Sequence, residues 1–143
     1  MEKNLVKEMR SNFTQLYLHC VWSTWDRLPL ITPDIQKQIY AVIIKECTQL
    51  ECTVIAIGGI EDHIHLLVGF PTTLNIAQLI KQIKGSSSHF VTHDIKPGEF
   101  FKWQGGYGVF TVSHNGVDNV ANYIRNQPLH HQQKSIISDW ELL

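Results

Sequence analysis

The chain has 143 residues, a formal net charge of −1, 43% hydrophobic and 17% charged residues. These values are typical of a single globular domain and exclude a disordered or strongly basic protein. We expect no membrane span, because no apolar run is long enough to cross a bilayer, and the polar residues at the start do not form a signal peptide. Three cysteines without a Cys-x-x-Cys pair indicate reduced thiols, so we expect a cytoplasmic protein.

The first half of the chain predicts one strand, one helix and a hairpin. Residues 1–12 are polar and predict a flexible or weakly helical lead-in. Apolar alternation within 13–25 predicts a strand that is covered on both faces. Thr32 and Pro33 predict the start of a helix that runs to about Leu50. β-Branched residues then predict strands at 53–60 and 63–70, paired as a hairpin.

The second half predicts a helix from about residue 76, which Gly85 weakens or ends, and a strand over 109–112. A further helix runs from Val117 to about Gln127, where Pro128 stops it, and a short docking helix is expected after Lys134. This order predicts an α+β fold, a ferredoxin-like or RRM-like split β-α-β antiparallel sheet with an added C-terminal helix. We expect one domain over 1–143, with a core of about 13–127 and a tail of 128–143.

Two histidines flank one aliphatic residue in His63-Ile64-His65. Alternate side chains of an extended strand share a face, so both imidazoles are expected to point the same way. Two neutral imidazoles side by side can bind one divalent metal ion. The alternative is a strand with two solvent-facing histidines. In this fold the first and third strands are usually central, which would place the pair in the middle of the sheet.

Tyr123 and Gln127 lie one turn apart on the helix that follows the fourth strand, and this helix can fold over the open face of the sheet. Gln127 can give a metal its amide oxygen. Tyr123 offers a phenol, which is a poor nucleophile at neutral pH because its reference pKa is about 10. A divalent cation on the phosphate oxygens would assist attack on a phosphodiester, giving a covalent phosphotyrosine. The alternative is a tyrosine that only packs.

These motifs together resemble a known family. The segment Glu61-Asp62-His63-Ile64-His65-Leu66-Leu67-Val68 is similar to the His-hydrophobic-His (HUH) motif of single-tyrosine transposases of the insertion-sequence 200/605 group. The likeness continues in residues 17–24, 79–87 and 103–112, and closes on Tyr123-Ile124-Arg125-Asn126-Gln127. It covers most of 13–127. The uncharged Ser86 and Ser87, and an altered Trp-Gly-x-Gly-Tyr segment at 103–107, bear on DNA affinity and target choice more than on the chemistry.

The resemblance implies a metal-dependent, homodimeric enzyme that cleaves and rejoins single-stranded DNA through a 5′-phosphotyrosine. Its partner would be the hairpin ends of a mobile element. His63, His65 and Gln127 would hold Mg²⁺ or Mn²⁺, with Tyr123 as the nucleophile. In this family the tyrosine helix of one subunit can complete the histidine pair of the other, so sites in cis and in trans both stay open.

The DNA contacts, the other histidines and the overall function each have alternative interpretations. Lys81, Lys84 and Arg125 are the candidate phosphate contacts, with a solvated helix face as the alternative. His19 and His131, like the remaining histidines, have no spacing partner and are expected in packing or on the surface. A domesticated palindrome-repeat-associated tyrosine transposase and a non-catalytic nucleic-acid-binding module are the alternative functions. A histidine-triad hydrolase is set aside, because Leu67 stands where that family needs another histidine.

Overall fold

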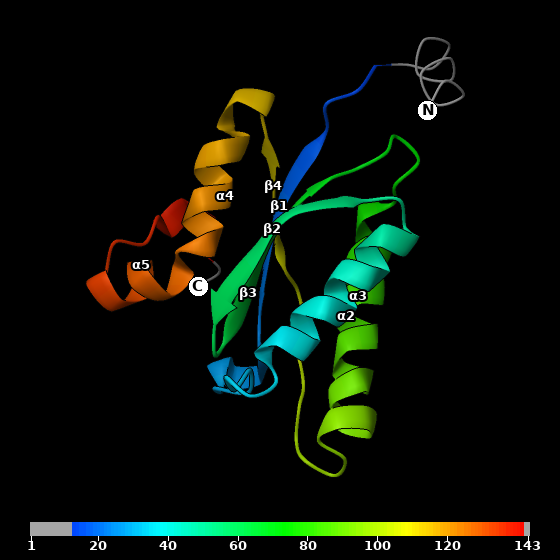
Figure 1. Ribbon diagram of the computed structural model, residues 1–143, viewed down its shortest axis with the longest axis vertical. Coiled ribbons are helices and arrows are strands. Elements are labelled where there is room, and N and C mark those ends of the chain that lie inside the picture. The colour runs from blue at the N-terminus through cyan, green and yellow to red at the C-terminus, as the bar shows by residue number, and fades with distance from the viewer. Residues whose placement is uncertain (1–12, 142–143) are drawn as a thin grey trace.

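The computed structural model describes residues 13–141 (Figure 1), so the predicted lead-in at residues 1–12 lies outside the described residues. The strands are β1 (Tyr17–Ser23), β2 (Thr53–Ile60), β3 (His63–Gly69) and β4 (Gly108–Val112). The helices are α2 (Gln36–Gln49), α3 (Ile76–Phe90), α4 (Val117–Arg125) and α5 (Gln127–Gln133). Short 3-10 turns lie at Trp25–Arg27, His114–Gly116 and Ser138–Trp140, and a π-helical turn follows α3 at Val91–Ile95.

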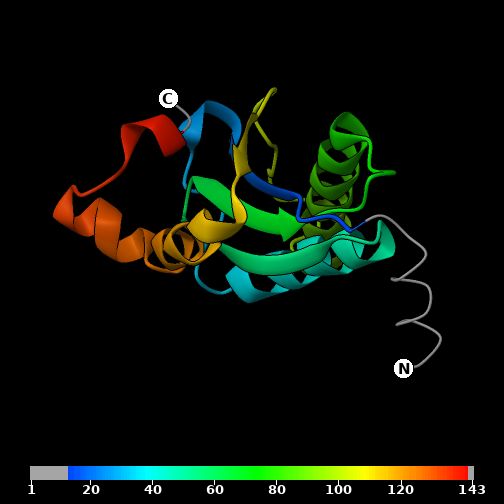
Figure 2. The same cartoon turned by 90° about the horizontal axis from the view of Figure 1, so that it is seen from above.

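The four strands form one antiparallel sheet in the order β2-β3-β1-β4, which confirms the predicted α+β fold. β3 and β1 are the central strands, as expected for this topology. Helices α2 and α3 cover one face of the sheet, whereas α4 and then α5 lie on the other (Figures 1 and 2). The sheet is therefore covered on both faces.

Alternation along the strands divides the buried residues between the two faces. The larger core lies under α2 and α3 and includes Trp22 of β1 and Leu66 of β3. The smaller core lies under α4, where Leu67 of β3 packs with Val120 and Ile124. Because His65 is two residues before Leu67 on the same strand, its imidazole faces α4 rather than the larger core.

Gly58 of β2 allows α4 to approach the sheet closely. A Cβ atom at this position would lie 2.3 Å from the backbone oxygen of Ile124 in α4. Gly58 is also paired with His65 across the β2–β3 ladder. The missing side chain therefore lets the backbone of α4 pack directly beside the histidine strand.

Two predicted helix boundaries differ from the structure. The helix expected from Thr32 begins at Gln36, because the residues before it form a turn. α3 continues through Gly85, since Asn75 caps its start and Leu79, Ile80 and Ile83 are buried along one face. That burial outweighs the glycine cost of about 1 kcal/mol.

The C-terminal region also differs from the prediction. Pro128 was expected to stop the helix, but it stands in the first turn of α5, where a missing N–H costs little. The docking helix expected after Lys134 is a 3-10 turn at Ser138–Trp140.

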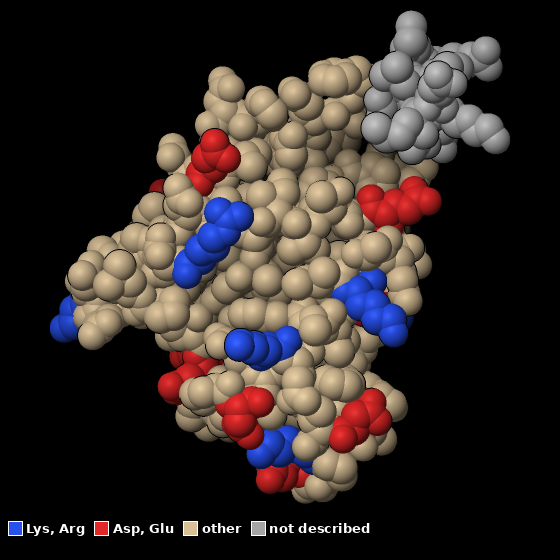
Figure 3. Space-filling view, in the orientation of Figure 1, with Lys and Arg blue, Asp and Glu red and all other residues tan. Residues whose placement is uncertain are grey.

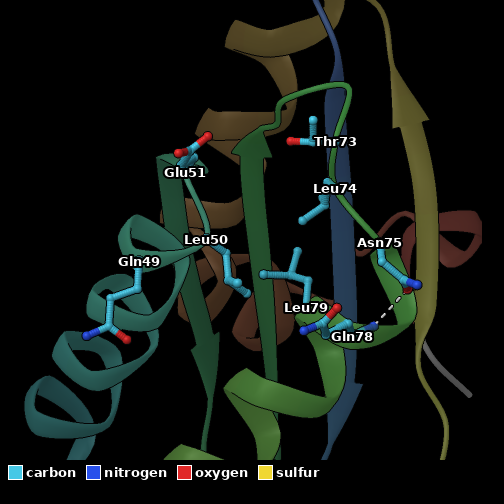
Figure 4. A pocket seen from close by; sticks show the side chains of 8 residues that line it. All are labelled: Gln49, Leu50, Glu51, Thr73, Leu74, Asn75, Gln78 and Leu79. Atoms are coloured by element: carbon cyan, nitrogen blue, oxygen red, sulfur yellow. Dashed lines mark hydrogen bonds between the residues drawn. The ribbon is translucent and has the colours of Figure 1, made fainter.

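No helix among residues 13–141 has the length and apolar character needed to cross a membrane. A cavity of about 280 Å³ lies between the end of α2 and the start of α3 (Figure 4). Its lining includes Gln49 and Asn75, whose side chain caps α3 by accepting a hydrogen bond from the Gln78 amide. Among residues 13–141, no imidazole, thiol or tyrosine lines this cavity.

Candidate active site between the sheet and α4

His63 and His65 lie side by side on β3, fully buried, with ring centroids 5.0 Å apart. The Nδ1 atom of each ring has a polar partner. His63 Nδ1 donates to Asp62 Oδ1 at 2.7 Å, and His65 Nδ1 lies 2.8 Å from His19 Nε2. Both Nε2 atoms therefore face the space under α4.

The carboxylate of Glu141 stands between the two Nε2 atoms. Its Oε1 lies 3.3 Å from His63 Nε2 and its Oε2 lies 2.8 Å from His65 Nε2. Glu141 follows the Ser138–Trp140 turn, which brings the C-terminal segment back over the sheet. Burial alone would raise the pKa of Glu141, but the two histidines and Tyr123 lower it well below its ordinary value.

Tyr123 and Gln127 reach the same place from the helices. The Tyr123 hydroxyl donates to Glu141 Oε2 at 2.9 Å and accepts from the Ile137 amide at 3.0 Å. Gln127 Oε1 lies 3.0 Å from His63 Nε2. The structure thus brings together the four residues that the sequence suggested for catalysis and metal binding, and it does so within one chain.

The pKa values of the buried groups are shifted in opposite directions. Burial would lower the pKa of His63, but hydrogen bonds with Asp62, Glu141 and Gln127 outweigh burial and raise it to about 9. Burial lowers the pKa of His65 and raises that of Tyr123. The Tyr123 phenol is therefore protonated at neutral pH, and its proton points at Glu141.

Sequence reasoning missed three residues of this cluster. Glu141 lies in the segment that was expected to dock as a short helix, but its carboxylate has no spacing partner among the predicted site residues. His131 Nε2 lies 2.9 Å from Glu141 Oε1 and 3.1 Å from Gln127 Oε1, one turn along α5 from Gln127. His19 was expected in packing or on the surface, yet it contacts His65. The alternation of β1 places His19 on the face of the sheet that α4 covers. Only the register between β1 and β3 shows that it lies next to His65.

The residues present fit a divalent metal ion. One donor atom each from His63, His65 and Glu141 can be chosen so that all three lie within 4.8 Å of one another. Among the described residues, His65 Nε2 has no partner with hydrogen-bond geometry, although the Glu141 carboxylate is near, and Gln127 Nε2 also has none. A buried nitrogen without a hydrogen bond is costly unless another ligand satisfies it. The mixed nitrogen and oxygen donors suit a transition metal such as Mn²⁺ better than Mg²⁺.

The three basic residues suggested for phosphate binding lie outside this cluster. Lys81 is exposed on α3. The Lys84 ammonium donates to the backbone oxygens of Gln104 and Gly106, and Arg125 donates to the backbone oxygen of Ile55. Basic and acidic side chains alternate on the face shown in Figure 3, without a large patch of one sign.

The family model described as "Transposase IS200 like" matches residues 12–127. The chain belongs to the IS200-like transposase family. The match spans the strand with the histidine pair and ends at Gln127, so the residues carrying the resemblance noted in the sequence lie within it. No match was found among curated proteins.

Two solved structures share the fold of this IS200-like chain. A candidate transposase from Deinococcus radiodurans R1 is 24% identical, with a TM-score of 0.66, over 82% of this chain and 95% of that one. A REP-associated tyrosine transposase bound to a REP hairpin is 16% identical, with a TM-score of 0.67, over 93% of this chain and 79% of that one.

Proposed function

We propose that this chain is a metal-dependent transposase that cleaves and rejoins single-stranded DNA through a 5′-phosphotyrosine formed on Tyr123. One observation carries the proposal: the phenol and the imidazole pair converge on a single carboxylate. Glu141 Oε2 lies 2.9 Å from the Tyr123 oxygen and 2.8 Å from His65 Nε2. A phosphate taking the place of that carboxylate would be in contact with both the nucleophile and the metal-binding edge of the histidines.

His63 and His65 would hold the ion through their Nε2 atoms, and Gln127 or Glu141 would supply an oxygen. When bound, a divalent cation offsets the charge that develops on the phosphate oxygens. His63 must be unprotonated to bind it, so binding displaces the proton that Asp62 and Glu141 stabilise on this ring. We therefore expect tighter metal binding as the pH rises.

In the proposed reaction the Tyr123 oxygen forms a bond to phosphorus, and the bond from phosphorus to the 3′ oxygen breaks. The phenol releases its proton, and the departing 3′ oxygen takes one up to become a hydroxyl. The covalent intermediate keeps a phosphodiester, so a 3′-hydroxyl can reverse the step without ATP. Before attack, the Tyr123 hydroxyl has to exchange its present acceptor, Glu141, for the phosphate.

The proposed partner is single-stranded DNA with a hairpin, such as the end of a mobile element. The REP hairpin bound by the REP-associated neighbour supports this choice. All residues of the proposed site come from one chain, so we propose that the tyrosine acts in cis even if the enzyme is a homodimer. Lys81, Lys84 and Arg125 remain proposed phosphate contacts, and the cytoplasmic location remains a prediction.

The test uses 3′-labelled single-stranded oligonucleotides tiled across the DNA on both sides of the gene, with and without the predicted hairpins. A 5′-phosphotyrosine keeps the 3′ part of the strand, so the label stays with the protein on a denaturing gel. We expect a covalent band with Mn²⁺ and none with EDTA. Tyr123→Phe should abolish the band.

Tyr40→Phe is the matched control, because Tyr40 lies on α2, which covers the other face of the sheet, and its hydroxyl accepts a hydrogen bond from Gln36. It should keep the band. A band that persists in Tyr123→Phe contradicts the proposed nucleophile. Hairpin binding without any covalent band, across all tiles with either Mn²⁺ or Mg²⁺ present, supports the non-catalytic alternative instead.

A further inference from the structure

His19 on β1 is a third buried imidazole that the proposed chemistry does not use. Its side chain is 1% exposed, and its Nε2 lies 2.8 Å from Nδ1 of His65. The two ring centroids are 5.1 Å apart with an interplanar angle of 31°. The short nitrogen–nitrogen distance is that of a hydrogen bond between the ring edges.

The proton positions on this pair follow from the proposed role of His65, so this inference rests on the proposed function. A neutral imidazole carries one N–H and one lone pair. If His65 binds a cation through Nε2, its N–H must be on Nδ1 and needs an acceptor. His19 Nε2 is in place to accept it, which puts the proton of His19 on its own Nδ1.

We propose that His19 is a positioning residue, which fixes the tautomer and ring orientation of His65 for metal binding. The other histidine has a different kind of support, because His63 Nδ1 donates to the carboxylate of Asp62 at 2.7 Å. The Nδ1–H of His63 thus has an anionic acceptor, Asp62, whereas that of His65 has a neutral one, His19. Partners of this kind commonly tune metal affinity by 10–100-fold.

Packing is the competing explanation for a buried His19. Its ring contacts Trp140 and Phe110, with centroids 5.8 Å and 5.9 Å away. If only packing mattered, phenylalanine would serve at this position, whereas the positioning role requires an acceptor near His65 Nδ1. Glutamine can place its amide oxygen close to the position of an imidazole Nε2. The two substitutions therefore separate the explanations.

The experiment measures Mn²⁺ affinity by isothermal titration calorimetry for the wild type, His19→Phe and His19→Gln. His114→Phe is the matched control, because it makes the same change at an imidazole that bonds Tyr17 instead of the proposed ligands. We expect His19→Phe to weaken Mn²⁺ binding by about 10–100-fold. His19→Gln should recover most of that loss, and the control should bind as the wild type does.

A second readout covers the case in which His19→Phe folds poorly. With Zn²⁺ as a diamagnetic probe, ¹⁵N NMR should show the His65 proton on Nδ1 in the wild type and in His19→Gln. A folded His19→Phe variant that binds Mn²⁺ as tightly as the wild type overturns the positioning role but leaves the proposed function standing. A His65 proton found on Nε2 in the Zn²⁺-loaded protein also overturns the positioning role. If the wild type binds no Mn²⁺, the proposed function fails first and this inference falls with it.

Discussion

Gly58→Ala tests whether the close packing of α4 on β2 sets the geometry of the site. The new Cβ would lie 2.3 Å from the Ile124 backbone oxygen, whereas carbon–oxygen contacts are ordinarily no closer than about 3.3 Å. α4 or β2 must therefore move by about 1 Å. Such overpacking costs about 1–3 kcal/mol of unfolding free energy. A 1 Å displacement of the helix with Tyr123 should also reduce the rate of covalent complex formation by about 100-fold.

The assay combines urea unfolding with the yield of the covalent protein–DNA complex in Mn²⁺. Gly85→Ala is the control, because Gly85 lies in the middle of α3 and its added Cβ would meet nothing within 4 Å. We expect that control to raise the unfolding free energy by about 0.5–1 kcal/mol and to leave the covalent yield unchanged. A Gly58→Ala protein as stable and active as the wild type would refute the reasoning. Lower stability with unchanged activity would show that the position of α4 does not limit the chemistry.

Three further predictions follow from ionisable groups in or beside the core. In EDTA, the stability that His63 contributes should be fully present below its unfolded pKa of about 6.5 and lost as the pH rises through about 9, because its folded pKa is raised. Urea unfolding from pH 6 to 10 should show this slope, and Glu141→Gln should flatten it; equal slopes would contradict the proposed pairing. Asp62→Asn should weaken Mn²⁺ binding by about tenfold, whereas Asp34→Asn, which alters an exposed ion pair with Lys96, should not change it in calorimetry. Burial raises the pKa of Cys20 and Cys47 to about 12, so a thiol reagent at pH 8 should label them only after unfolding; rapid labelling of the native protein would contradict this.

The sequence predicts the sheet well because its signals are local. The alternation in β1 and β3 and the β-branched residues of β2 each lie within one segment, and the order of the elements leaves few topologies to consider. The same local logic finds His63 and His65 on one face, and Tyr123 and Gln127 on one helix face. Local signals were misleading at Gly85, because the buried face of α3 keeps the helix continuous through this glycine.

The parts of the site that were missed depend on contacts between segments far apart in the sequence. His19 meets His65 because the register pairs Val21 with His65, which places His19 diagonally across the ladder. A shift of one residue would turn His19 toward α2 and α3, and no residue type in β1 signals the register. Glu141 is harder still, because its place depends on a tail whose turn has no strong start or stop signal. A carboxylate at that place is stabilised by imidazoles that were themselves found from sequence. Because its contacts with His65 and Tyr123 depend on how the tail folds back, the sequence alone does not distinguish Glu141 from the other acidic residues.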